Sequence, residues 1–91
     1  SELIMNQLAK GKNNVQLSNK GIYKIEKLIS DVLISINLSN NKSKDATLLA
    51  SWRCPNLKTI DISKCGLQKI ENLDLPRLET IDMSHNKTPS V

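Results

Sequence analysis

Two stretches with the same pattern decide the fold: LKTIDISKC at residues 57–65 and LETIDMSHN at residues 78–86. Each has an aliphatic residue at the first, fourth and sixth places and a serine at the seventh. Two earlier stretches, KNNVQLSNK at 12–20 and LISINLSNN at 33–41, share the fourth, sixth and seventh places, and the four copies start 21, 24 and 21 residues apart. Four copies at so regular a period predict a repeat architecture.

The spacing within each copy predicts a short β-strand. Alternate side chains of a strand point to opposite faces, so the fourth and sixth places turn inward together while the third and fifth turn outward. A single strand cannot bury such a face, but stacked neighbours can. The residues expected to form two inward columns are Val15, Leu17, Ile36, Leu38, Ile60, Ile62, Ile81 and Met83.

The four copies resemble the leucine-rich-repeat family, whose period is about 20–29 residues. The resemblance implies an α/β solenoid, which is a right-handed coil with a short parallel sheet on its concave side and 3₁₀ or helical turns on its convex side. The returns GIYKIEKL (21–28) and GLQKIENL (66–73) resemble the intracellular repeats of a protein-phosphatase regulator. Residues 54–65 resemble the cysteine-containing repeats of F-box substrate receptors, and also the repeats of acidic nuclear phosphoproteins and messenger-RNA export factors.

The two ends of the repeat region are expected to differ. Residues 1–11 have apolar residues at helical spacing and end at Gly11, which predicts a helix that caps the first coil. A partner-binding amphipathic helix is the alternative there. The repeats occupy residues 12–91, with copies starting at 12, 33, 57 and 78. No return segment follows Asn86, so the C-terminal end is expected to be uncapped, as a fragment or under a partner chain.

One connection differs from the others. The segment between the second and third copies is three residues longer than its counterparts. Asp45 is a candidate N-cap and Pro55 bars continuation of a helix, so we expect a short helix between them.

The ninth place of a copy is expected to face the backbone of the neighbouring coil. An asparagine there both donates and accepts hydrogen bonds, and the ladder residues of the second, third and fourth copies are Asn41, Cys65 and Asn86. Cys54 and Cys65 are expected to be buried free thiols, because a zinc site needs about four ligands and the chain has one histidine. The resemblance implies an intracellular protein, since the cysteine-bearing caps of extracellular members do not occur here.

The charge pattern argues against several functions. The twelve outward strand residues include two aspartates and no lysine or arginine, although the net charge of the chain is +4. Phosphate binding needs clustered cations and base stacking needs aromatic side chains, so direct nucleic-acid binding is not predicted. His85 stands where the chain leaves the fourth strand, and no nucleophile and base converge on it. We therefore predict no enzyme, cofactor or metal site, and no stretch of about 20 apolar residues predicts a membrane span.

The resemblance implies a protein–protein interaction scaffold or accessory subunit within a larger protein or complex. Its concave face is expected to bind a basic or polar segment of another protein. Two alternatives stay open: an accessory subunit of a ribonucleoprotein or messenger-RNA export factor, in which contact with nucleic acid is indirect, and a ubiquitin-ligase substrate adaptor. The candidate partner-binding residues are Gln16, Asn37, Thr59, Asp61, Thr80, Asp82 and His85.

Two of these candidates, Asp61 and Asp82, hold the same place on neighbouring strands. Like charges directly opposed in a sheet are mildly destabilising, so the stability of the fold gives no reason for the pair. We therefore expect the replacement of both aspartates by alanine to leave folding unchanged or slightly improved, while binding of the partner weakens.

Overall fold

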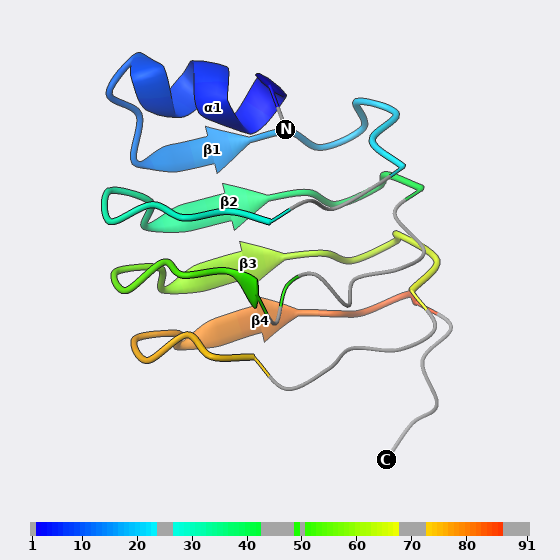
Figure 1. Cartoon of the computed structure of the whole chain (residues 1–91). Coiled ribbons are helices and arrows are strands. Elements are labelled where there is room, and N and C mark those ends of the chain that lie inside the picture. The colour runs from blue at the N-terminus through cyan, green and yellow to red at the C-terminus, as the bar shows by residue number, and fades with distance from the viewer. Residues whose placement is uncertain (1, 24–26, 43–48, 50, 68–72, 87–91) are drawn as a thin grey trace.

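The computed structural model describes residues 2–23, 27–42, 49, 51–67 and 73–86. In these residues one helix, α1 (Glu2–Ala9), is followed by four strands of three residues each. The strands are β1 (Asn14–Gln16), β2 (Ser35–Asn37), β3 (Thr59–Asp61) and β4 (Thr80–Asp82). Figure 1 shows α1 beside β1, and the strands stacked in sequence order with β4 at the far edge.

All three strand pairings are parallel, and equivalent places lie side by side. The fourth places of the four copies, from Val15 to Ile81, are register neighbours across the sheet. Backbone hydrogen bonds between neighbouring coils continue past the strands. The amide of Leu38 donates to the carbonyl of Asp61 at 2.8 Å, and the amide of Asn40 donates to the carbonyl of Ser63 at 2.9 Å. The strand prediction is confirmed, and the parallel sheet fits the expected solenoid-like α/β fold.

The aliphatic core lies behind the sheet. Six of the eight residues predicted to face inward are buried; Ile81 is partly buried, and Met83 is 40 % exposed. The inward prediction is therefore wrong for Met83. The physical reason is its position: side chains of the inner coils are covered by a coil on each side, whereas β4 has a strand on one side among the described residues. Leu49 and Trp52, both fully buried, fill the wider second coil.

The returns behind the sheet are described in part. Residues 24–26 and 68–72, the middle of the two predicted 3₁₀ returns, lie outside the described residues, as does most of the helix expected from Asp45. At the described end of that segment the backbone forms a 3₁₀ turn, in which the amide of Trp52 donates to the carbonyl of Leu49 at 3.1 Å. Of the structure that is described, no helix is long and apolar enough to cross a membrane.

A side chain of α1 pairs with the free edge of β1. The Nε2 atom of Gln7 donates to the carbonyl of Gln16, and the Oε1 atom of Gln7 accepts from the amide of Gln16, both at 3.3 Å. One amide side chain thus stands where the peptide group of a neighbouring strand would stand. Leu8, on the same helix, packs against the core.

Candidate interaction surface

The fifth places of the four copies form a row across the outward face of the sheet. Gln16, Asn37, Asp61 and Asp82 are register neighbours. We call this row, with the flanking Thr59, Thr80 and His85, the strand face. Neighbouring strands lie about 4.7–4.9 Å apart, so the two carboxylates leave the backbone at adjacent positions. Asp61 is partly buried, and Asp82 is exposed.

Each of these carboxylates is bound back onto its own chain. The Oδ1 atom of Asp61 accepts hydrogen bonds from the amide of Ser63 at 3.0 Å and from its hydroxyl at 2.7 Å. The Oδ1 atom of Asp82 accepts the same two bonds from Ser84, at 3.0 and 2.7 Å. A side chain that accepts from the backbone two residues on forms an Asx turn. The expectation that stability gives no reason for the two aspartates is therefore wrong.

The second copy makes the same turn with a neutral side chain. The Oδ1 atom of Asn37 accepts from the amide of Ser39 at 2.9 Å. Asparagine thus satisfies the geometry of the turn, and aspartate adds a negative charge to it. Asp-x-Ser or Asn-x-Ser at the fifth and seventh places is the sequence signal for this turn, and the strand pattern alone did not reveal it.

Alternation also predicts an outward side chain for the serine at the seventh place, and one of the four serines differs from this prediction. Ser63 is 8 % exposed, so the outward prediction is wrong for this residue. Its hydroxyl turns back to Asp61, and its carbonyl accepts from the amide of Asn40 in the coil before it. In contrast Thr59 and Thr80, at the third place, are exposed as expected.

The electrostatics keep the C-terminal part of the strand face negative. The hydrogen bond from the Ser84 amide, followed by that from the Ser84 hydroxyl, lowers the pKa of Asp82 below its ordinary value, and His85 contributes a smaller lowering. The carboxylate is therefore charged at neutral pH. Within the described residues, the Oδ2 atoms of Asp61 and Asp82 accept no hydrogen bond, so one oxygen of each remains available to a partner.

His85 stands at the end of the row, in the left-handed backbone region. Its φ is 58°, and the eighth places of the other copies share this conformation. Asparagine adopts it more readily than lysine or histidine, so the first two copies have the residue that suits the turn. The His85 side chain is exposed beside Asp82. Its backbone equivalents are Asn19, Asn40 and Lys64.

Asn41 joins the first two coils beneath the strand ends. Its Oδ1 atom accepts from the amides of Lys20 and Ile22, both at 3.0 Å. Its Nδ2 atom donates to the carbonyls of Leu17 at 3.0 Å and Leu38 at 2.8 Å. A single side chain that is 3 % exposed therefore satisfies backbone groups in both coils.

Asn86 repeats these contacts between the third and fourth coils. It accepts from the amides of Cys65 at 2.9 Å and Leu67 at 3.0 Å, and donates to Ile62 at 2.9 Å and Met83 at 2.8 Å. The ladder residue of one copy thus bonds the coil before it. In the described structure α1, and not a coil, precedes β1, which agrees with the exposed lysine at the ninth place of the first copy.

Cys65 holds the ladder position of the third coil. Its thiol lies 3.2 Å from the carbonyl of Leu38 and 3.4 Å from that of Ser63, so it takes over the donor bonds of an asparagine. Both Cys65 and Cys54 are buried and free, as predicted. Burial raises the pKa of each thiol, so neither is a ready nucleophile at neutral pH. Among the residues that the structure describes, no three His, Cys, Asp or Glu side chains are placed to hold a metal ion.

A comparison with protein families supports the resemblance noted in the sequence. Residues 55–90 match the model for leucine rich repeats, in two copies. The matched segment contains β3 and β4, with Asp61, Asp82 and the ladder residues Cys65 and Asn86. The comparisons with curated proteins and with solved structures found no match.

Proposed function

We propose that the chain is a protein–protein interaction module whose strand face binds a basic or polar segment of another protein. The observation that carries this proposal is the in-register pair Asp61 and Asp82, each with one carboxylate oxygen engaged and one available. A lysine or arginine between them relieves their repulsion and gains charge-assisted hydrogen bonds. The match to leucine-rich repeats, which commonly bind other proteins, supports a module of this class and favours a non-enzymatic function.

The flanking residues are suited to a polar partner. Thr59 and Thr80 present exposed hydroxyl groups along the row, and His85 adds a ring with donor and acceptor nitrogens. The row contains none of the tryptophan and tyrosine anchors that dominate strong interfaces. We therefore expect modest affinity from this face alone, which suits a scaffold or an accessory subunit held by further contacts.

We also propose that another strand, from further repeats or from a partner chain, pairs with β4. In the inner coils the sixth-place amide donates to the next coil, as Ile62 donates to the carbonyl of Asp82 at 2.9 Å. The amide of Met83 has the same place on β4, with no described strand beyond it. The exposed side chain of Met83 supports this proposal, because a further coil would bury it.

The test of the strand face removes the negative charges of Asp61 and Asp82 while it retains the turns that these residues form. Because Asn37 makes the same turn as the two aspartates, the double variant D61N/D82N keeps the acceptor oxygens and removes both charges. A partner recovered by pull-down and then titrated against the purified variant should bind about two- to thirtyfold more weakly, since exposed charge pairs contribute about 0.2–1 kcal/mol each.

The matched control is D74N/E79Q, which removes two exposed carboxylates that are not part of the strand face. It should change the affinity less than D61N/D82N does. If every recovered partner binds D61N/D82N as tightly as the unmodified chain, the acidic pair is not the binding site.

A further inference from the structure

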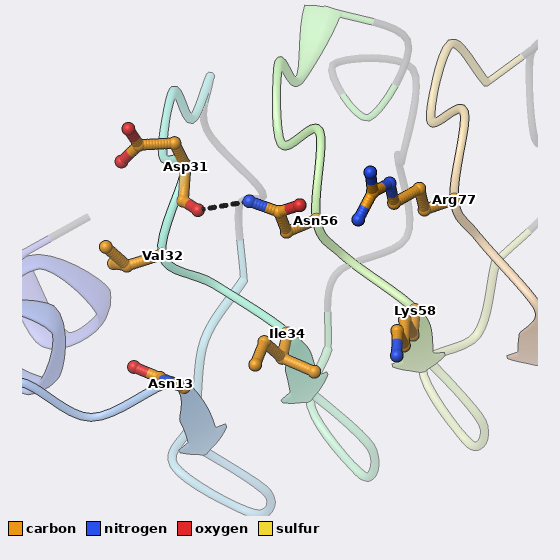
Figure 2. Close-up of a pocket in the computed structure, with 7 residues that line it drawn as sticks. All are labelled: Asn13, Asp31, Val32, Ile34, Asn56, Lys58 and Arg77. Carbon is orange, nitrogen blue, oxygen red and sulfur yellow. Dashed lines mark hydrogen bonds between the residues drawn. The ribbon is translucent and has the colours of Figure 1, made fainter.

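A second surface lies where the chain enters the strands, apart from the strand face. The structure has a hollow of about 300 Å³ there, formed by three successive entry turns and the starts of the strands. Asp31 and Val32 come from the turn before β2, Asn56 from the turn before β3, and Arg77 from the turn before β4. Figure 2 shows these side chains, with Lys58 at the start of β3.

The backbone around the hollow is held by hydrogen bonds between coils. The amide of Lys58 donates to the carbonyl of Ile34 at 2.7 Å, and the amide of Ile34 donates to that of Asn13 at 2.8 Å. The Nδ2 atom of Asn56 donates to the carbonyl of Asp31 at 2.7 Å, which ties two entry turns together. The sheet therefore fixes the spacing of the backbone positions from which these side chains extend.

Two cations from neighbouring coils line one end of the hollow. Lys58 and Arg77 are exposed, and within the described residues neither has an ion pair or a side-chain hydrogen bond. In Figure 2 the guanidinium of Arg77 extends from its own coil toward Asn56. In Figure 2 the carboxylate of Asp31 lies on the side of the hollow away from Arg77, so it does not neutralise the end that has the two cations.

The other end of the hollow has two aliphatic side chains, Val32 and Ile34, together with Asp31 and Asn13. Val32 is 47 % exposed, and Ile34 beside it is partly buried. A hollow with two cations at one end and an exposed valine at the other suits an extended ligand that has both an anionic and an apolar side chain. Nucleic acid fits less well, because two cations neutralise few phosphates and no aromatic side chain lines the hollow for a base to stack on.

We propose that this hollow binds an extended acidic segment of a partner protein. A glutamate or aspartate of that segment lies between Lys58 and Arg77, and the arginine offers a paired donor geometry for the carboxylate. A neighbouring aliphatic side chain packs on Val32 and Ile34. The site has the opposite charge preference to the strand face, so it binds a different segment, and its existence does not depend on the function proposed above.

The test uses a defined probe and nuclear magnetic resonance of the ¹⁵N-labelled chain. The probe is a blocked peptide of alternating leucine and glutamate, and its twin has glutamine in place of glutamate. Amide shifts that saturate with the glutamate peptide are expected for residues 31–34, 56–58 and 77. The charge-reversing variant K58E/R77E should weaken binding at least tenfold.

A matched control makes the result specific. K27E/K42E reverses two exposed lysines outside the hollow, and it should change the affinity less than threefold. If K58E/R77E does not fold, the milder K58Q/R77Q replaces it, with at least a threefold loss expected.

Three outcomes would overturn the proposal. One is an absence of saturable shifts around the hollow at millimolar peptide. The second is an equal response to the glutamine twin. The third is tighter binding of a single-stranded oligouridylate to the same residues, which would assign the hollow to nucleic acid.

Discussion

The two edge strands of the sheet have the same backbone pattern but different surroundings. On β1, Val15 is fully buried, and Gln7 of α1 occupies the hydrogen-bonding positions of Gln16. On β4, Ile81 is partly buried, and Met83 is 40 % exposed. Both strands have an aliphatic residue at the fourth place, so we attribute the difference in burial to what lies beside each strand. In a stacked repeat each coil is stabilised mainly by its nearest neighbours.

The inner ladder extends this comparison below the strands. Asn41 is 3 % exposed between two coils, whereas Asn86 makes the equivalent bonds but is partly exposed. The loss of these hydrogen bonds should therefore cost more stability at Asn41 than at Asn86, because water reaches Asn86 and not Asn41.

The largest effect is expected at the sixth place of the inner coils. Leu38→Ala should lower the free energy of unfolding by about 2–5 kcal/mol, because it opens a cavity at a fully packed position. Met83→Ala, at the same place on β4, should cost less than about 1 kcal/mol because water already reaches the side chain. Urea denaturation followed by circular dichroism measures both. Equal losses would show that Met83 is covered in solution.

The second prediction compares the ladder asparagines. Asn41→Ala removes the asparagine bonds to the amides of Lys20 and Ile22 and to the carbonyl of Leu17, and should cost about 2–4 kcal/mol. The buried Leu17 carbonyl accounts for about 1–3 kcal/mol of this loss, and the two part-buried amides, which water reaches, account for the rest. Asn86→Ala should cost about half as much because water can replace its bonds. The same denaturation experiment tests both, and a larger loss for Asn86→Ala would contradict the comparison.

The third prediction concerns the bond between α1 and β1. Gln7→Ala removes two exposed hydrogen bonds of 3.3 Å and should cost about 0.5–1.5 kcal/mol. Hydrogen exchange should accelerate most at the amide of Gln16. Gln7→Glu serves as control, because it retains an acceptor for that amide but loses the donor. If Gln16 exchanges no faster in Gln7→Ala, the side chain does not protect the edge of β1.

The period of the sequence predicted the strands and their register, because four copies with inward fourth and sixth places leave one way to stack a common core. The exposure of Met83 did not follow from the same pattern. The repeat pattern shows which side chains of a coil point inward. Burial of those side chains also depends on a neighbouring coil that covers them, and the pattern within one copy does not describe that neighbour. The predicted column was correct where coils exist on both sides, as at Ile60 and Ile62.

The candidate site was less accessible from the sequence. The row from Gln16 to Asp82 follows from register. In each of the two turns, however, the aspartate side chain accepts from the amide and the hydroxyl of the serine two residues on, across the end of the strand. Strand alternation contains no information about such a bond. Lys58 and Arg77 are 19 residues apart and come together through the stacking of two entry turns, so a search along the chain did not place them in one hollow.

The smallest predicted effect is the acid dependence of the Asp82 turn. The bonds from Ser84 lower the pKa of Asp82 in the folded chain. A carboxyl with a lowered folded pKa stabilises the fold above its unfolded pKa, about 3.9, and the contribution is lost as the pH falls through that value toward the folded pKa. Asp82→Asn retains an acceptor oxygen that does not titrate, as Asn37 does in the second coil.

The measurement is the difference in free energy of unfolding between the unmodified chain and Asp82→Asn at pH 6 and at pH 3. Every other carboxyl is present in both proteins, so this difference isolates Asp82. The unmodified chain should lose more stability on acidification than the variant does. His85 contributes a smaller part of the lowering, so the same comparison made in a His85→Gln background should retain most of the effect. An equal loss of unfolding free energy in the two proteins would contradict this prediction. It would show that Ser84 stabilises the carboxylate of Asp82 no more than it stabilises the neutral amide of the variant. The charge of Asp82 would then have no role in the turn and would be available for binding.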